Sequence, residues 1–222
     1  MTDVLITPSR LRQFAPRCDA DAIAPLLQAA ALSFGIDTPR EVRHWMATLF
    51  CESAGFTRVV EAMGYSASRL MEVWPSRFPT LASAKPYANN GRALANKVYG
   101  GRLGNTGPDD GWLYRGSGPI QVTGKFNFKR ASEWCGVDFV ANPDLLRTWE
   151  YGSVAAAGFW KANGLNGIVA ADPGEKLFNS IEAAVRANEE DDLRQARKVV
   201  NGGLIGLDHV REALLRAAPI FV

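Results

Sequence analysis

The sequence predicts a mostly helical domain, and three observations lead to this fold class. Apolar residues recur at helical spacing, residues that start and stop helices separate these stretches, and glycine concentrates between residues 100 and 124. Of the 222 residues, 47% are hydrophobic and 22% charged, which is typical of a folded protein. We therefore expect one helical domain over residues 1–222, with two lobes and a glycine-rich loop between them.

The first third of the chain holds two clear helical patterns. In the first, Asp19 or Asp21 precedes an apolar stripe that stops at Gly35. In the second, Thr38-Pro39-Arg40-Glu41 combines a capping box with proline at the first helical position, and the apolar stripe after it stops at Gly55. Further helices are expected at residues 66–74, 91–99, 126–134, 151–163, 181–200 and 207–217.

The segment from Gly100 to Gly124 breaks the helical pattern. Its eight glycines and two prolines predict an irregular loop followed by a short extended piece or small β-hairpin. On a strand, Gln121 and Thr123 would share one face, and an amide beside a hydroxyl suits sugar hydroxyls or a water held for attack. A phosphate-binding loop is the rival interpretation, but no Gly-Lys-Ser/Thr follows and the dinucleotide-binding fingerprint is absent.

Charge and composition exclude several function classes. The 25 Lys and Arg against 23 Asp and Glu give a net charge of +2, far from the basic balance of nucleic-acid-binding domains. Three widely spaced cysteines predict free thiols, and two histidines make a metal site improbable. The N-terminus lacks the apolar run of a signal peptide, and no stretch reaches the roughly 18 apolar residues of a membrane span. We expect a protein that is made in the cytoplasm, binds no nucleic acid or metal, and has no stable membrane association.

Two glutamates are candidates for acid/base chemistry. Glu52 lies seven residues after Trp45, which brings it to within about 20° of the apolar face of its helix. Burial and the negative end of a helix dipole both favour a protonated carboxyl, the form that a general acid in glycoside hydrolysis needs. Glu61 follows after a glycine break, so a second carboxylate comes from another backbone segment. The alternatives are a Glu52 paired with an arginine or exposed at a frayed helix end.

A series of longer motifs is spread along residues 20 to 217. It comprises Phe50-Cys51-Glu52-Ser53-Ala54-Gly55-Phe56-Thr57-Arg58, Glu61, Gly64-Tyr65-Ser66, Ala95 to Tyr99, Gly104-Asn105, Gly107-Pro108, Asp110-Gly111-Trp112, Tyr114-Arg115-Gly116, Gly118 to Gly124, Asn127, Asn142-Pro143, Asn201-Gly202-Gly203 and Gly206-Leu207. This series resembles glycoside hydrolase family 19, and within it the chitinase-like endolysins of bacteriophages. The resemblance implies a lysozyme-like α-helical fold of two lobes, with a cleft between them, that hydrolyses β-1,4 bonds beside N-acetylglucosamine with inversion.

The resemblance also implies roles for individual residues. Glu52 is then the general acid and Glu61 the general base, and Thr123 carries the hydroxyl that helps hold the attacking water. No organic cofactor or metal is implied. Residues expected to bind the glycan are Gln121, Asn127 and Asn201, which match polar positions of the family's cleft, and Tyr65, Trp112, Tyr114 and Arg115 around the glycine-rich loop.

Some positions depart from the family pattern. Cys51 stands where a histidine is usual, Ala54 where a glycine is, and Ser117 where an arginine is. The family's terminal Asp-Arg pair appears as His209-Val210. In the family that arginine lies in the polar network of the base, so either Arg211 takes over its role or that network is rewired.

The function expected from these observations is a monomeric phage endolysin that cleaves peptidoglycan strands. Such an enzyme waits in the host cytoplasm until a phage-encoded membrane pore releases it to the cell wall. A chitinase is the enzymatic alternative, and a catalytically silent glycan-binding protein is the alternative from another class. The intact Glu52, Glu61 and Thr123 favour an active enzyme. A single domain also leaves no separate wall-binding module.

Overall fold

The computed structural model describes residues 4–171 and 175–222. The chain divides into two compact units: unit 1 contains the residues up to Val59, Gly118–Ile120 and Thr148–Val222, and unit 2 contains Val60–Ser117 and Gln121–Arg147. The mainly helical class is confirmed, since β-structure in the described residues is limited to two isolated bridges. Over the same residues, no helix has both the length and the hydropathy needed to cross a membrane.

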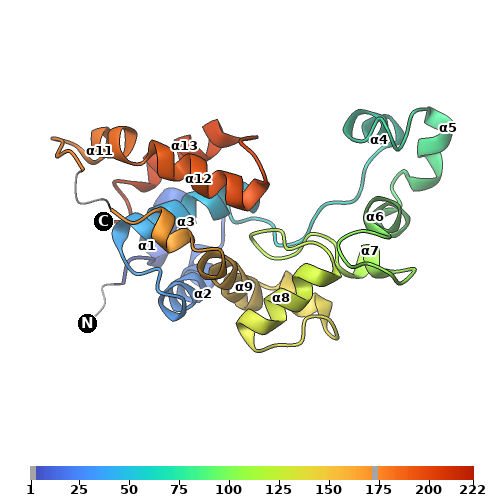
Figure 1. Cartoon of the computed structure of the whole chain (residues 1–222), viewed down its shortest axis with the longest axis horizontal. Helices are drawn as coiled ribbons and strands as arrows, with labels where there is room; N and C mark the ends of the chain where they lie inside the picture. The colour runs from blue at the N-terminus through green and yellow to red at the C-terminus, as the bar shows by residue number, and fades with distance from the viewer. Residues whose placement is uncertain (1–3, 172–174) are drawn as a thin grey trace. The chain divides into compact units, whose positions relative to one another are not determined.

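Unit 1 is built around helix α3 (Pro39–Glu52). Helix α3 packs on α13 (Leu207–Ala217) (Figure 1). Helix α2 (Ala20–Ser33) packs on α9 (Trp149–Ala162). Large side chains such as Trp45 and Trp160 are fully buried, as expected for the apolar stripes. The other helices of unit 1 are α1 (Pro8–Phe14), α10 (Leu165–Ile168), α11 (Ile181–Asn188) and α12 (Glu190–Asn201).

The start of α3 follows the sequence-based prediction. Thr38 Oγ1 accepts a hydrogen bond from the Glu41 backbone N–H, and the Glu41 carboxylate accepts one from the Thr38 N–H, which completes the capping box. Pro39 occupies the first helical turn, where its missing N–H costs nothing. Because this end is fixed by local chemistry, the position of Glu52 at the other end of the helix follows from the length of the apolar stripe.

The single helix expected at residues 181–200 is wrong, because the chain forms two helices there. α11 ends at Asn188, Glu189 adopts a non-helical φ of −116° and ψ of 2°, and α12 begins at Glu190. The side chain of Glu189 is 2% exposed and accepts hydrogen bonds from Arg43 and His44 of α3. Burial of this carboxylate in a long-range ion pair overrides the local helical preference.

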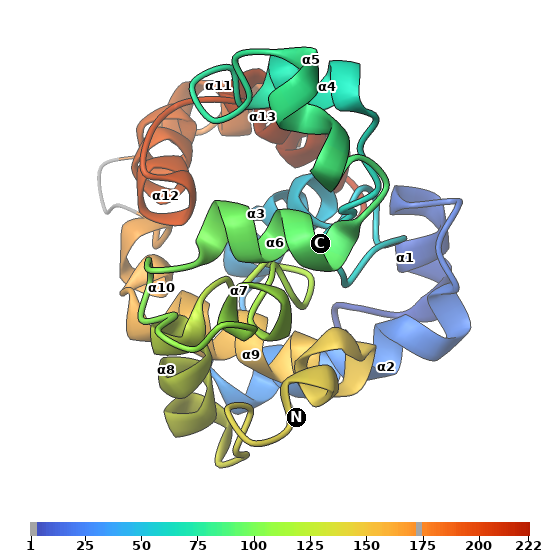
Figure 2. The same cartoon turned by 90° about the vertical axis from the view of Figure 1, so that its right-hand side faces the viewer.

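Unit 2 is a smaller helical assembly. Helix α6 (Gly91–Tyr99) runs beside the short α7 (Asp110–Leu113), as Figures 1 and 2 show. Phe78, Leu94 and Val98 lie at the centre of its core, with Leu70 of α4. The remaining elements of unit 2 are α4 (Ala67–Val73), α5 (Leu81–Ala84), α8 (Lys125–Cys135) and the 3₁₀ helices η1 (Lys85–Tyr87) and η2 (Pro143–Arg147).

The glycine-rich segment is mostly irregular, as expected, and its hairpin is minimal. Ser117 and Val122 exchange both backbone hydrogen bonds, at 3.0 and 2.8 Å, and no longer ladder forms among the described residues. The predicted strand alternation over residues 119–123 is wrong, because Gln121 has a φ of +56°. This left-handed residue turns the chain tightly, so Gln121 and Thr123 are placed by a turn and not by a strand.

Candidate active site

Glu52 is the last residue of α3 and lies in a polar environment within unit 1. Its side chain is 20% exposed, and Oε1 pairs with Nη1 of Arg197 from α12 at 2.5 Å. No described residue contacts Oε2 by a hydrogen bond. Of the alternatives that the sequence left open, the pairing with an arginine is the one observed. One oxygen is therefore fixed by a guanidinium and the other is open to a ligand.

Arg197 links Glu52 to the loop after α12. It is 9% exposed, and its Nε and Nη2 donate to the carbonyl oxygen of Ile205 at 2.9 and 2.7 Å. The side chain of Asn201 donates to the same oxygen at 3.3 Å. The predicted site residue Asn201 thus shares the Ile205 carbonyl with Arg197. The planar fork of Arg197 contacts both this carbonyl and Glu52.

The backbone turn that follows Glu52 is unusual. Ala54, Gly55 and Phe56 all have left-handed φ values, of 53°, 74° and 58°. Ser53 Oγ holds this turn, since it donates to the Leu49 carbonyl at 2.6 Å and accepts from the Phe56 N–H at 2.9 Å. Two non-glycine residues in the left-handed region store backbone strain, of a kind that clusters at functional sites.

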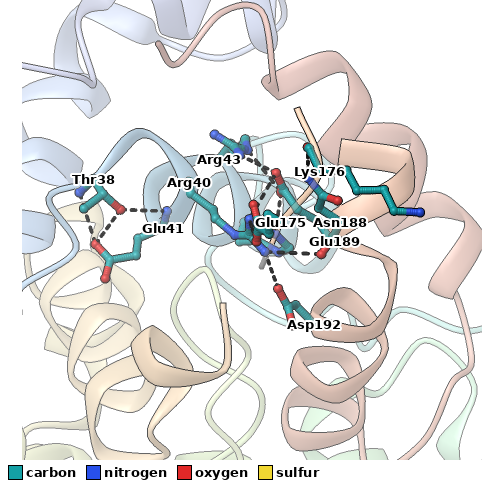
Figure 3. A network of polar contacts seen from close by, with 10 residues as sticks. Thr38, Arg40, Glu41, Arg43, Glu175, Lys176, Asn188, Glu189 and Asp192 are labelled. Carbon is teal, nitrogen blue, oxygen red and sulfur yellow. Dashed lines mark hydrogen bonds and ion pairs between the residues drawn. The ribbon is translucent and has the colours of Figure 1, made fainter. Parts of the chain in front are cut away.

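A buried ion network braces the start of α3 against α12 (Figure 3). Arg43 and His44 both contact the Glu189 carboxylate, and Arg40 pairs with Asp192 at 2.5 Å and with Glu175. Burial acts to raise the pKa of Glu189, but hydrogen bonds from His44 and Arg43 outweigh it and lower the pKa to about 2. Burial lowers the pKa of His44, so this ring is neutral at pH 7. The network fixes the helix that carries Arg197.

Glu61 is held at both carboxylate oxygens by groups of unit 2. The Tyr99 hydroxyl donates to Oε1 at 2.7 Å and the Gly116 N–H donates to Oε2 at 3.1 Å. The backbone N–H of Glu61 donates back to the Gly116 carbonyl at 2.9 Å. Burial and the adjacent Glu61 charge raise the pKa of Tyr99 far above its usual range, so this phenol remains a donor. Hydrogen bonds therefore fix the orientation of the Glu61 carboxylate, and the residue is half-buried.

The glycine-rich turn approaches Glu61 closely. A β-carbon on Gly116 would lie 2.7 Å from Gln121 Oε1 and 3.1 Å from Glu61 Oε2, so only glycine fits here without a shift. Thr123 Oγ1 donates to the Gln121 carbonyl at 2.9 Å, and the Asn127 amide donates to the Thr123 carbonyl at 2.8 Å. The structure thus brings Glu61, Gln121, Thr123 and Asn127 into one connected set in unit 2.

Arg115 and Trp112 form a stacked pair in unit 2. The guanidinium of Arg115 lies 3.7 Å from the Trp112 ring centroid and donates to the Trp112 carbonyl at 2.7 Å. Burial, followed by the charge of Arg147, lowers the pKa of Arg115 to about 10. Arg147 donates to Ser117 Oγ at 3.1 Å, so a guanidinium from η2 contacts the position where the family pattern has its own arginine.

Two predicted aromatic ligands have different environments. The Tyr114 ring is 4% exposed, packs on Phe128, and its hydroxyl donates to the Val140 carbonyl, so it belongs to the interior of unit 2. Tyr65 is half-buried and meets Trp74 edge-on with ring centroids 5.3 Å apart. Burial of Tyr114 leaves Tyr65 as the more accessible ring.

Two residues of the site were not assigned from the sequence as partners of the glutamates. Arg197 lies within the apolar stripe of α12, between Leu193, Ala196 and Val200, and a charged residue in such a stripe is a usable signal. Tyr99 has no such signal, because aromatic rings are usually core residues. Arg211 pairs with Glu190 and Asp208. The described hydrogen bonds to the carboxylate of Glu61, the candidate base, come from Tyr99 and Gly116.

Comparison with known proteins identifies the family of this chain. No protein-family model matches it. A Haemophilus influenzae protein described as a glycosyl hydrolase family 19 domain-containing protein is 33% identical over 171 residues, which cover 76% of this chain and 74% of that protein.

Solved structures agree on the fold. Chitinase C from Streptomyces griseus superposes with a TM-score of 0.58 at 16% identity, over 100% of this chain and 94% of that one. A bacterial family 19 chitinase gives a TM-score of 0.53 at 16% identity, over 96% and 95%. With the curated relative at 33% identity over three quarters of both sequences, the chain belongs to glycoside hydrolase family 19.

Proposed function

We propose that this glycoside hydrolase is a phage endolysin that cleaves β-1,4 bonds of bacterial peptidoglycan by inversion. The observation that carries the proposal is the pair of oriented carboxylates: Glu52 fixed at one oxygen by Arg197, and Glu61 fixed at both by Tyr99 and Gly116. Two glutamates supplied by separate backbone segments suit the two roles that glycoside hydrolysis requires.

In the proposed mechanism Glu52 acts as the acid and Glu61 as the base. Glu52 protonates the glycosidic oxygen as the bond to the anomeric carbon breaks, while Glu61 takes a proton from the water that attacks the opposite face of the sugar. Thr123 Oγ1 already donates to the Gln121 carbonyl, so its lone pairs are available to accept a hydrogen bond from that water. Exchange with solvent then restores both protonation states.

Arg115, stacked on Trp112, offers a further contact surface for the glycan. A guanidinium held flat on an indole ring keeps its N–H edge available at low conformational cost. Trp112 is half-buried, so part of the ring is accessible to the apolar face of a sugar. These contacts would bind chitin as well as peptidoglycan, since both contain N-acetylglucosamine.

The test compares E52Q and E61Q with wild type on purified peptidoglycan and on chitin oligomers. Each variant keeps the size of the side chain and is expected to lower kcat by at least about 100-fold. E52Q also leaves the nearly buried Arg197 without its carboxylate, so thermal unfolding is followed beside kcat to check that both variants are folded under the assay conditions. E182Q, at an exposed pair with Arg186, is the matched control and should keep full activity.

The products identify the substrate and the bond. Borohydride labelling and mass analysis of new reducing ends distinguish muramic acid from glucosamine termini. Turnover of chitin oligomers with none of peptidoglycan would overturn the endolysin proposal in favour of a chitinase, and full activity of E52Q would overturn the assignment of the acid.

A further inference from the structure

A cavity in unit 1 lies directly beside the residues that flank Glu52. It measures about 390 Å³, and Phe50, Cys51, Ala54 and Gly55 form one wall. Helix α13 forms the opposite wall, and Arg17, from the segment between α1 and α2, completes it. None of the interactions described for Glu52 involves this cavity, so it is distinct from the contacts that orient the acid.

Two arginines and one glutamate supply the charges around this cavity, and all three residues are exposed. Arg17 and Arg216 line it with His209, and Glu212 is the single carboxylate in the lining. Neither arginine forms an ion pair with any described residue, although Arg216 and Glu212 are four residues apart on α13. Two guanidinium groups without carboxylate partners at one cavity are typical of a binding site for an anionic group.

Arg216 is also held in place. Its guanidinium lies 4.2 Å from the ring centroid of Phe50 and 4.9 Å from that of Phe14. Stacking on two aromatic rings restrains the side chain while leaving the N–H edge free, so little conformational entropy remains to be lost when an anion binds.

The cavity adjoins the candidate acid in the chain. Cys51, which forms part of its wall, directly precedes Glu52 at the end of α3. A group bound in the cavity would therefore lie near a sugar held at Glu52.

We propose that this cavity binds a carboxylate-bearing, zwitterionic residue of the peptide stems of peptidoglycan. The carboxylate meets Arg17 and Arg216, and the ammonium of a diamino acid meets Glu212. Chitin carries neither group, so the cavity would select peptidoglycan over chitin by charge. The inference rests on the proposed function, because only a peptidoglycan glycosidase would meet such stems beside its glycan.

The first test uses hydrolysis. The double variant R17Q/R216Q removes two charges and keeps a polar side chain at each position. R12Q/R186Q removes two exposed arginines of unit 1 elsewhere and is the control. On peptidoglycan with intact stems, kcat/KM should fall about tenfold in R17Q/R216Q and stay within twofold in the control. On glycan strands freed of peptide by an amidase, both should match wild type. An equal loss on the two substrates, or no loss on either, overturns the proposal.

The second test needs no catalysis and so separates this inference from the proposed function. The tripeptide L-alanyl-D-glutamyl-diaminopimelate is titrated into full-length E52Q and followed by calorimetry and by NMR. Binding should weaken about tenfold with the added R17Q/R216Q changes, weaken with salt, and vanish when the peptide's carboxyl groups are amidated. Tripeptide binding that is insensitive to both arginines overturns the proposal, even if hydrolysis of peptidoglycan is intact.

Discussion

At the scale of single residues, Arg197 determines the surroundings of Glu52. It is nearly buried, and its only carboxylate partner among the described residues is Glu52. Its remaining donors are used on the Ile205 carbonyl, so the guanidinium cannot follow the carboxylate if Glu52 moves. The side chain thus holds the candidate acid to the loop after α12.

Replacing Arg197 is therefore expected to affect both activity and stability. R197A should lower kcat by at least tenfold, because Glu52 loses its orientation, and should lower the free energy of unfolding by about 3 kcal/mol, because a partly buried carboxylate is left unpaired. R197K should recover only part of the activity, since an ammonium cannot span Glu52 and Ile205 together. Steady-state kinetics and urea unfolding measure both effects.

The control for this prediction lies on the same helix. The Arg194 side chain is 42% exposed, and its Nη1 lies 3.9 Å from Glu190 Oε1, which is too far for a hydrogen bond. R194A should therefore change neither quantity measurably. If R197A retained the kcat of wild type, Arg197 would have no positioning role.

At the scale of elements, the C-terminal turn of α3 combines strain with tight packing. Ala54 is exposed, with a φ of 53°, at a position where the family pattern has glycine. Gly55 is buried, and an added β-carbon would lie 3.3 Å from the Phe50 ring. Both left-handed positions therefore favour glycine, and contact with Phe50 adds a steric reason at Gly55.

Exchanging residues in this turn should change stability in opposite directions. A54G removes the left-handed strain of alanine and should raise the free energy of unfolding by about 0.5–1 kcal/mol, after the entropy that glycine adds to the unfolded chain. G55A should lower it by about 1–2 kcal/mol through strain and contact with Phe50. Chemical denaturation of both variants checks this, and a loss of stability in A54G would show that the turn is not strained.

At the scale of the whole molecule, the network around Glu189 makes stability dependent on acid. The folded-state pKa of Glu189 is about 2, below the ordinary value of 4.5, so its contribution to the free energy of unfolding is fully present above pH 4.5 and is lost as the pH falls toward 2. The lowered pKa of His44 also makes the protein less stable in acid. Below pH 6.5 the unfolded state binds a proton at this histidine more readily than the folded state does, so the free energy of unfolding falls.

The variant E189Q isolates this contribution. At pH 7 it should lower the free energy of unfolding by about 3 kcal/mol, because Arg43 loses its buried partner. The difference from wild type should shrink as the pH is lowered from 5 toward 2, where the wild-type carboxylate also becomes neutral. Urea unfolding at pH 7, 5 and 3.5 measures it. A difference that stays constant with pH would contradict the assigned pKa.

The sequence by itself determined the features that depend on local chemistry. The capping box at Thr38 and Glu41, and the stripes that became α2, α3, α6 and α13, follow from hydrogen bonding and periodicity within a few residues. The two glutamates stood out by resemblance and by their place after a helix and a glycine break. Their catalytic roles remain predictions.

Only the tertiary structure decided the features that depend on distant residues. The break between α11 and α12 exists because Glu189 is drawn to Arg43 and His44, about 145 positions earlier in the chain. The partners of the glutamates, Arg197 and Tyr99, and the cavity beside Cys51 likewise come from segments far apart in sequence. Charge pairing and burial between residues so far apart leave no periodic pattern in the sequence, so these contacts can be identified only in the tertiary structure.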